Sequence, residues 1–305
     1  MTRALVTGAT GYIGSHLGRH LVDSGWTVHA VVRRDSSHER LHPDVICHIH
    51  DGTAAGMRRL VADAAPDVVF HLASLVQGEH STTTLDAIVA ANVGLGAQLL
   101  DAMASAKCLR LVEAGSYWEY DADGGYHPNS FYAAAKHAFR AFVPYYVDRH
   151  GLSATTLILY DVYGSGDWRG KFLSHMLRSL QRNEPLAATP GEQLLDFVHV
   201  DDVSRGFHIA AQMEPLAEPG QISYRLDSGE QMTLRDATEL MARLAGRPAR
   251  VTWGARPYPP AQIMKPLAVG PRLPGWEPKI PLDQGFRMLL QDAGLTGVAH
   301  GALRS

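Results

Sequence analysis

A tyrosine and a lysine four residues apart are the side chains whose spacing most directly suggests chemistry. They stand in the segment Tyr132-Ala133-Ala134-Ala135-Lys136, and on a helix this spacing puts the phenol and the ammonium on one face. A free phenol titrates near pH ~10, too high for acid–base work at neutral pH, whereas a neighbouring cation favours the phenolate. When other motifs accompany it, the pair predicts a proton donor.

A glycine-rich turn near the amino terminus predicts a nucleotide site. Gly8, Gly11 and Gly14 lie in the run Gly8-Ala9-Thr10-Gly11-Tyr12-Ile13-Gly14, between an apolar stretch and a helical pattern. Glycines permit a tight turn and the close approach of backbone to pyrophosphate, and the following helix offers unpaired N–H groups. The position of this run favours binding of a dinucleotide cofactor.

The end of the second predicted strand bears on which dinucleotide binds. An acid there would accept hydrogen bonds from the ribose hydroxyls of NAD and repel a 2′-phosphate, but here Arg33 and Arg34 precede Asp35. Guanidinium groups suit bidentate contacts to phosphate. We therefore expect NADP(H), with NAD(H) as the alternative. The other interpretation is a solvated arginine pair neutralised by Asp35 and Glu39.

The elements that must position these residues alternate between short apolar runs and helical patterns. Such alternation is typical of βαβ units, and the apolar strands suit a sheet buried on both faces. We expect an α/β fold with a Rossmann-like doubly wound parallel sheet, with strands at 4–6, 28–33, 45–49, 68–72, 109–113 and 154–159, and helices at 13–24, 87–106 and 131–150.

The second half of the chain predicts a smaller, mixed α/β lobe. Eight prolines lie in 251–281, which predicts loops and short strands there. Helices are expected at 233–245, with Thr233 as N-cap, and at 282–293. The predicted division gives 1–165 to the dinucleotide-binding domain, with 195–213 returning to it, and gives 166–194 and 214–305 to a substrate-binding lobe.

Composition excludes several classes of protein. The 305 residues are 46% hydrophobic and 19% charged, with a formal net charge of −3, so no basic field draws the chain to nucleic acid or anionic lipid. The two cysteines, Cys47 and Cys108, have no ligand or disulfide spacing. No signal peptide and no run of roughly 18 apolar residues is recognised. We expect a soluble cytoplasmic protein without a membrane partner.

With these motifs in place, the chain resembles an extended short-chain dehydrogenase/reductase of the NAD-dependent epimerase/dehydratase group, whose members act on nucleotide sugars. The resemblance covers nearly the whole length. It rests on residues 7–14, His71-Leu72-Ala73-Ser74, Asn92-Val93-Gly94, 132–136, Val162-Tyr163-Gly164, 196–203 and Pro274-Gly275-Trp276-Glu277-Pro278.

The resemblance implies roles for individual residues. Tyr132 would be the general acid/base and Lys136 its pKa modulator and a ligand of the nicotinamide ribose. The catalytic Ser/Thr of the family lies four residues before a marker tyrosine, which here gives Ser116 with Tyr120 as the marker. Asp51-Gly52 resembles the adenine contact. The implied cofactor-binding set is Gly8, Thr10, Gly11, Tyr12, Ile13, Gly14, Arg33, Arg34, Asp51, Gly52, Leu72, Ala73, Ser74, Asn92, Tyr132 and Lys136.

Departures from the family pattern narrow the expected reaction. Related sugar 4,6-dehydratases carry an Asp-Glu pair directly after the catalytic threonine, where this chain has Tyr117-Trp118. The GDP-fucose synthase type has a catalytic cysteine two residues before the marker tyrosine, which is also the Trp118 position. Elimination and C3/C5 epimerisation therefore lack their acids and bases. Hydride transfer at C4 by Ser116, Tyr132 and Lys136 remains.

Several activities stay open at this point. We expect an NADPH-dependent reductase of the C4 keto group of a nucleotide-diphosphate 4-keto-6-deoxyhexose, linked to TDP or CDP. The spacing from Ser116 to Tyr132, the aromatic pair Tyr117-Trp118 and residues 163–172 resemble the CDP-paratose and CDP-abequose synthase type, and related enzymes make deoxysugars for natural products. The alternatives are an NAD-dependent nucleotide-sugar 4-epimerase, a reductase of a non-nucleotide ketone, and a non-catalytic NADP-sensing regulator.

Substrate contacts follow less directly from the resemblance. The family usually has an arginine for the diphosphate immediately before Asp196-Phe197, where this chain has Leu195. A charged hydrogen bond of that kind is worth ~1.5–3 kcal/mol, so another cation must replace it or the substrate is no diphosphate. The expected substrate-binding residues are Val76, Ser116, Tyr117, Trp118, Asp161, Lys171 and Arg256.

Two further expectations concern metals and assembly. Sixteen histidines include His48 and His50, which would share one face of a strand, but no matching carboxylate pattern accompanies them and no metal is expected. The predicted helices at 87–106 and 131–150 carry exposed apolar positions. In the family they pair across a two-fold axis, so we expect a homodimer through a four-helix bundle.

Overall fold

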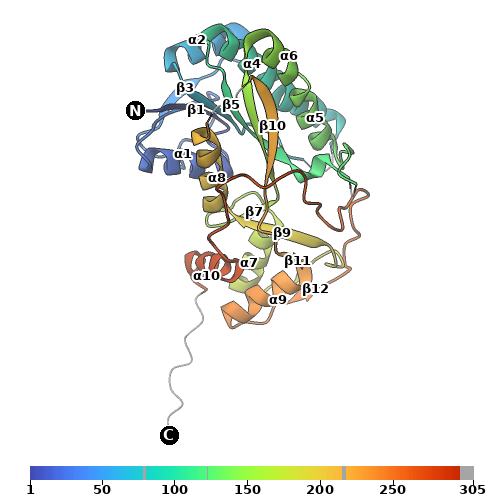
Figure 1. Ribbon diagram of the computed structural model, residues 1–305. Helices are drawn as coiled ribbons and strands as arrows, with labels where there is room; N and C mark the ends of the chain where they lie inside the picture. Colours follow the sequence, from blue (N-terminus) through green and yellow to red (C-terminus); the bar gives the residue numbers. More distant parts are fainter. Residues whose placement is uncertain (78–79, 122, 215–217, 296–305) are drawn as a thin grey trace. The chain divides into compact units, whose positions relative to one another are not determined.

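A seven-stranded parallel sheet dominates the first of two units of this computed structural model (Figure 1), which describes residues 1–77, 80–121, 123–214 and 218–295. Among these residues the strand order is β10-β6-β5-β4-β1-β2-β3. Its strands are β1 Arg3–Thr7, β2 Thr27–Val32, β3 Ile46–Ile49, β4 Val68–His71, β5 Arg110–Ser116, β6 Ser153–Leu159 and β10 Gly220–Leu226. This order confirms the predicted Rossmann-like doubly wound sheet.

Helices cover both faces of this sheet (Figure 1). On one face, His208 of α8 contacts His20 of α1 and Trp26, and Phe207 of α8 packs on Phe70 of β4. On the other face, an apolar core joins the sheet to α2, α4, α5 and α6. The bounds are α1 Tyr12–Asp23, α2 Ala54–Ala64, α4 Leu95–Ala106, α5 Phe131–Arg140, α6 Val143–His150 and α8 Val200–Gln212.

The helix predicted over 131–150 is wrong as a single element. It divides into α5 and α6 because Pro144 lacks a backbone N–H and is accommodated in the first turn of α6 rather than inside a helix. The helix predicted over 87–106 begins earlier, as α3 Thr82–Val89, and continues through a π-helical turn at Ala90–Gly94 into α4. The predicted strand 109–113 extends to Ser116, which therefore ends β5.

One helical stretch among the described residues, Thr82–Ala106, is long and apolar enough to cross a membrane by length and composition. The sequence interpretation that no run reaches this criterion is therefore wrong. Buried core helices of proteins without a membrane meet the same test, and one such stretch is weak support for a membrane span.

The predicted dimer surface has exposed apolar side chains. Leu85 and Val89 on α3, with Phe142 and Tyr145 at α6, are exposed. The homodimer stays a prediction, which a mass measurement in solution tests.

The second unit contains a small mixed sheet. Its strand order is β11-β9-β7, with β11 antiparallel and β7 parallel to β9, and β12 pairs separately with β8. The strands are β7 Asp161–Tyr163, β8 Leu186–Ala187, β9 Leu194–His199, β11 Gln231–Thr233 and β12 Val251–Thr252, and the helices are α7 Phe172–Arg182, α9 Leu234–Ala245 and α10 Leu282–Asp292.

Local signals in residues 233–281 behave as predicted. The Thr233 hydroxyl caps α9 by accepting from the N–H of Asp236 at 3.0 Å, and the proline-rich 251–281 holds only the two-residue β12 besides loops and an isolated bridge.

The chain forms two compact units, each made of three separate segments. The first unit is Met1–Leu159, Val203–Leu226 and Leu267–Trp276, and the second is Tyr160–Asp202, Asp227–Pro266 and Glu277–Ser305. The functional division predicted from the sequence stays a prediction, and its residues 215–217 and 296–305 lie outside the described part.

Candidate active site

The glycine turn joins β1 to α1 at the carboxyl end of the sheet, and its geometry demands glycine at two positions. Gly8 has a φ of +71°, and a Cβ there would lie 2.6 Å from the backbone nitrogen of Ala73. A Cβ on Gly14 would lie 2.1 Å from the carbonyl oxygen of Gly8. The Gly11 N–H donates to that same oxygen at 2.9 Å. The turn therefore holds α1 directly against β1 and the loop after β4.

The start of α1 offers its backbone donors to a ligand. Its N-cap, Gly11, makes no side-chain hydrogen bond, and the first turn contains no acidic residue. Unpaired N–H groups and the positive end of the helix dipole bind phosphate groups. Thr10 and Ile13 are half-buried beside the turn, and Tyr12 is buried. This donor set fits the pyrophosphate of a dinucleotide, at the point between β1 and β4 where the strand order reverses.

The arginine pair lies on the surface directly after β2. Arg33 and Arg34 are both exposed, and the Nε of Arg33 lies 3.6 Å from Asp35 Oδ1, with both side chains 81% exposed. Because exposed ion pairs of this kind contribute little, neither guanidinium is committed to the protein by it. The placement leaves both available to a charged ligand.

Asp51 makes its bonds in the structure to the start of α2. Its Oδ1 accepts from the backbone N–H and the hydroxyl of Thr53, at 2.9 and 2.7 Å, and its Oδ2 accepts from Arg59 at 3.0 Å. Gly52 has a φ of +85° in the same turn. The adenine contact expected of Asp51-Gly52 stays a prediction.

The side-chain amide of Asn92 holds the loop after β4 in place. Asn92 is buried in the π-helical turn and accepts from the Ser74 hydroxyl at 3.0 Å and from the Leu75 N–H at 2.7 Å, and donates to the Leu75 carbonyl at 3.1 Å. π-helical turns inside α-helices are frequent at functional sites. Asn92 thus fixes 72–75 beside Gly8, which places four predicted cofactor residues, Leu72, Ala73, Ser74 and Asn92, together.

The three predicted catalytic residues come from two neighbouring elements. Ser116 ends β5, and Tyr132 and Lys136 lie on one face of α5, which is capped by the Ser130 hydroxyl accepting from the Ala133 N–H at 3.3 Å. Trp118 joins them, because its ring meets the ring of Tyr132 edge-on with centroids 6.1 Å apart. All three of these candidate side chains are buried.

Sequence reasoning missed three charged residues under this trio. Glu113, Glu119 and Arg140 are buried, and Arg140 bonds both carboxylates. A signal was present in the sequence, because Arg140 follows Lys136 by four residues and two cations on one helix face require acids opposite them.

His71, at the end of β4, is held neutral beside Lys136. Burial, and to a lesser extent the Lys136 ammonium, lowers the pKa of His71 to about 3, and its Nδ1 lies 2.8 Å from the Thr7 hydroxyl. Because the unfolded chain takes up this proton near pH ~6.5 and the folded chain does not, stability is present above that pH and is lost as the pH falls towards 3.

We therefore expect His71 alone to remove about 2 kcal/mol of unfolding free energy between pH 7 and pH 5. Urea unfolding at both values measures this, and His71→Asn should reduce the pH dependence by that amount. The exposed His38 is the matched control, because His38→Asn should leave the dependence unchanged. An equal dependence in wild type and His71→Asn would contradict the assignment.

The predicted substrate residues divide between the units. In the first unit Val76 is exposed, Tyr117 is buried and Trp118 is half-buried. In the second unit the exposed Lys171 is the N-cap of α7, Asp161 begins β7, and Arg256 is exposed on the loop after β12, where its N–H donates to the Ala188 carbonyl at 3.0 Å. Leu195, in β9, packs against the apolar core of this unit.

His48 and His50, which were expected to share one face of a strand, contact different partners. His48 lies 2.8 Å from His29, whereas His50 follows β3 and lies 3.0 Å from the Gln98 side-chain oxygen. The prediction that His48 and His50 share a strand face is wrong, because β3 ends at Ile49. Among the described residues no cluster of three or more metal-ligating side chains occurs.

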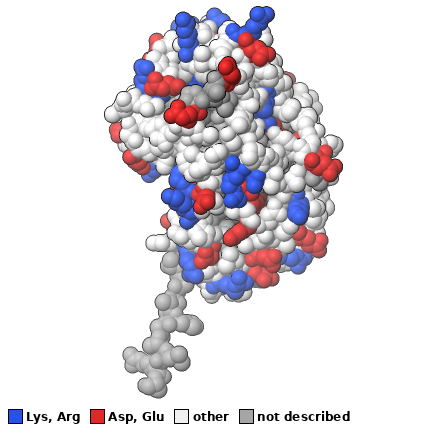
Figure 2. All heavy atoms as spheres, viewed as in Figure 1, with Lys and Arg blue, Asp and Glu red and all other residues white. Residues whose placement is uncertain are grey.

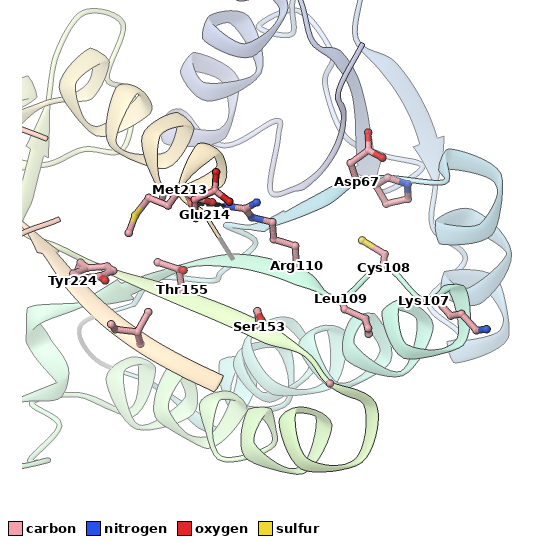
Figure 3. A pocket seen from close by; sticks show the side chains of 14 residues that line it. Asp67, Lys107, Cys108, Leu109, Arg110, Ser153, Thr155, Met213, Glu214 and Tyr224 are labelled. Carbon is pink, nitrogen blue, oxygen red and sulfur yellow. Dashed lines mark hydrogen bonds between the residues drawn. The ribbon is translucent and has the colours of Figure 1, made fainter. Parts of the chain in front are cut away.

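A cavity of about 400 Å³ in the first unit lies away from this site (Figure 3). Arg110 and Ser153, the first residues of β5 and β6, line it together with Met213 and Glu214 after α8. It therefore opens at the amino ends of the strands, opposite the glycine turn, and ligands of doubly wound sheets bind at the carboxyl ends.

Acidic and basic side chains are interspersed over the face shown in Figure 2.

Comparison with known proteins places the chain among sugar-nucleotide enzymes. Its residues 4–223 match the NAD dependent epimerase/dehydratase family. A CDP-abequose synthase of Salmonella typhimurium is 27% identical over 94% of this chain and 97% of the relative, and one of Yersinia pseudotuberculosis is 29% identical over 66% and 70%. The structure of the UDP-glucose 4-epimerase of Thermotoga maritima has a TM-score of 0.84 at 22% identity, covering 95% of this chain and 97% of that one, and thus the same fold.

Proposed function

Because the chain belongs to the NAD dependent epimerase/dehydratase family, we propose that it is an NADPH-dependent reductase of the C4 keto group of a nucleotide-diphosphate 4-keto-6-deoxyhexose. The resemblance to the CDP-abequose synthase type, expected from the motifs, is confirmed by relatives that match it nearly end to end. Those relatives are named for a nucleotide-linked sugar product, which supports a nucleotide sugar as substrate.

The observation that carries the proposal is the aromatic pair after Ser116. Tyr117 and Trp118 take the positions where elimination or epimerisation at C3 or C5 would need acids, bases or a thiol, and Trp118 packs edge-on against Tyr132. An indole is neither an acid nor a base in water, and a free phenol titrates near pH ~10. The chemistry left to the site is hydride transfer to a carbonyl.

The chain's own residues would then polarise the ketone and deliver a proton. The hydroxyls of Ser116 and Tyr132 donate hydrogen bonds to the keto oxygen and hold C4 in place. The hydride for C4 comes from the nicotinamide ring when the cofactor is bound. As negative charge develops on the oxygen, Tyr132 transfers its proton to it, and these hydrogen bonds strengthen in the transition state. Lys136 stabilises the resulting phenolate until a proton from solvent restores it.

The residues proposed to bind the cofactor lie at or near the carboxyl end of the same sheet. The glycine turn and the start of α1 would bind the pyrophosphate, and Asn92 would hold the 72–75 loop against the dinucleotide. The exposed Arg33 and Arg34 would contact the 2′-phosphate of NADP(H). The diphosphate of the sugar nucleotide needs a cation in place of an arginine at position 195, and Lys171 and Arg256 are our candidates.

We expect Arg34→Ala and Arg33→Ala each to weaken NADPH binding at least tenfold, because a hydrogen bond to a charged group contributes about 1.5–3 kcal/mol. NADH binding should stay unchanged, since it has no 2′-phosphate. Fluorescence titration with both cofactors measures this. Arg19→Ala, on the exposed face of α1, is the control. Equal weakening for NADH and NADPH would remove the phosphate role.

The test of the proposed function is the absorbance of the nicotinamide band while the protein is mixed with NADPH or NADH and freshly generated TDP-4-keto-6-deoxyglucose, or its CDP counterpart. Continuing oxidation of NADPH in preference to NADH supports the reductase. Protein that carries bound NAD and interconverts C4 epimers is instead the epimerase. Protein that binds NADPH and ignores both sugars refutes the nucleotide-sugar substrate.

A further inference from the structure

Four charged side chains form a buried charge cluster beneath the catalytic residues. Glu113, Glu119, Lys136 and Arg140 are 1%, 0%, 6% and 8% exposed. When all four are ionised, two carry positive and two carry negative charge, and the cluster as a whole is neutral. Charged groups are almost never buried this deeply unless they are paired. Removing one charge therefore leaves the others without compensation.

The Arg140 guanidinium connects the cluster. Its Nε donates to Glu113 Oε1 at 3.1 Å, its Nη2 donates to Glu119 Oε1 at 2.8 Å, and its Nη1 donates to the Tyr120 hydroxyl at 2.8 Å. The Thr156 hydroxyl adds a bond to Glu113 Oε1 at 2.6 Å. Although burial disfavours the charge, the two carboxylates raise the pKa of Arg140. The guanidinium is thus a fixed cation that orients both acids.

Glu119 reaches the catalytic serine directly. Its Oε1 accepts from the backbone N–H of Ser116 at 2.9 Å, and the Ser116 hydroxyl accepts from the N–H of Trp118 at 3.2 Å. These reciprocal bonds form a capping box around the short 3₁₀ turn Tyr117–Glu119. They set both the position of Ser116 at the end of β5 and the place of Trp118 against Tyr132.

Glu119 also bears on the charge of Lys136. Burial lowers the pKa of Lys136, and Glu113 from β5 and Glu119 oppose that effect, whereas Arg140 from α5 adds to it. His71 from β4 faces the same ammonium and is held neutral. Lys136 lies one turn before Arg140 on α5, and Arg140 bonds both carboxylates, so these carboxylates supply compensating charge for the Lys136 ammonium within the chain.

We propose that Glu119 is a positioning residue that fixes Ser116 through its backbone N–H and keeps Lys136 cationic for the reduction. The catalytic part of this inference rests on the proposed function, whereas the electrostatic part concerns the protein alone. Glu119 touches neither substrate nor cofactor in this role. Its second oxygen, Oε2, lies 3.9 Å from the Nδ1 of His137 and is buried without a hydrogen bond in the described structure, which costs free energy.

Lysine NMR tests the electrostatic part without any substrate. The chain has five lysines, so ¹³Cε-lysine labelling gives few signals, and Lys136→Arg identifies the one of interest. In Glu119→Gln, which keeps the size and an acceptor oxygen for Ser116, the pKa of Lys136 should fall by about one unit or more. The exposed Glu239 on α9 is the matched control, and Glu239→Gln should leave that pKa unchanged. An unchanged pKa in folded Glu119→Gln overturns the proposal.

A second comparison removes the same carboxylate without leaving Arg140 unpaired. Glu119→Gln/Arg140→Gln, set against Arg140→Gln alone, should again show the lower pKa of Lys136. Arg140→Gln by itself should raise that pKa, because a like charge is removed. This comparison decides the matter if Glu119→Gln does not fold, and equal Lys136 pKa values in the single and double variants overturn the proposal.

The pH profile of kcat tests the catalytic part. In Glu119→Gln, the pH at which activity is lost on the alkaline side should move down by the same shift that NMR records for Lys136, with NADPH affinity at pH 7 retained. A uniform loss of kcat at all pH values, without this displacement, would mean a merely structural role. If the chain reduces no sugar at all, the proposed function is refuted. The NMR comparison still tests the effect of Glu119 on the pKa of Lys136, because it needs no substrate.

Discussion

Tyr132→Phe is expected to lower kcat by about 10²–10⁴-fold. The substitution removes only the phenolic oxygen, which we propose as the proton donor to the developing alkoxide. The buried ring still packs against Trp118, so the fold and the cofactor site should persist. Steady-state kinetics with NADPH and the keto sugar measures the loss, and fluorescence titration should give an NADPH affinity equal to that of wild type.

Tyr145→Phe is the matched control for this prediction. Tyr145 lies on α6, is 58% exposed and contacts only Tyr146 and His150 among the aromatic rings described. Removing its hydroxyl should leave kcat unchanged. Turnover of Tyr132→Phe within a few fold of wild type would exclude Tyr132 as the acid and would leave Ser116 alone on the keto oxygen.

Gly14→Ala should abolish useful cofactor binding, with a loss of NADPH affinity of about 100-fold. The added Cβ would lie 2.1 Å from the Gly8 carbonyl oxygen and 2.7 Å from its carbon. Because both are backbone atoms, α1 must move away from the turn. Overpacking of this kind costs about 1–3 kcal/mol, and the moved N–H groups no longer converge on a phosphate. Titration with NADPH and a urea unfolding curve measure both effects.

One turn further along the same helix, Gly18 provides the control. A Cβ at Gly18 has as its nearest neighbour a Val45 methyl group at 3.9 Å, an ordinary contact. Alanine there removes the entropic cost of a helical glycine, so Gly18→Ala should raise stability by about 0.4–1 kcal/mol and leave NADPH affinity unchanged. If Gly14→Ala binds NADPH as wild type does, the turn is not the phosphate site.

Much of the first unit could be predicted because its signals are local. The strands of the sheet are short runs of β-branched and apolar residues, and the order of elements along the chain alternates as βαβ units do. In the second unit, too, Thr233 caps α9 as expected, because a threonine hydroxyl needs only the next backbone N–H groups. Two predictions were wrong in detail: the helix predicted over 131–150 divides before Pro144, and the strand predicted over 109–113 continues to Ser116.

The spacing of the candidate catalytic residues is an equally local signal, and their catalytic roles stay a prediction. The i to i+4 spacing of Tyr132 and Lys136 and the three glycines of the first turn are short-range patterns, and the fold confirms that each lies on the element that was expected to carry it. Leu195 was recognised as a departure, and the structure gives it a place against an apolar core.

The sequence by itself determined the sheet, the glycine turn and the candidate catalytic residues, because periodicity and spacing act within a few residues of one another. Only the tertiary structure decided which charges lie beneath them. Glu113 on β5, Glu119 on the 3₁₀ turn and Arg140 on α5 come from three elements, and their burial depends on how the helix packs against the strand end. Long-range packing sets the compensation of a buried charge, and the local spacing of Lys136 and Arg140 indicates a need for acids without identifying which acids meet it.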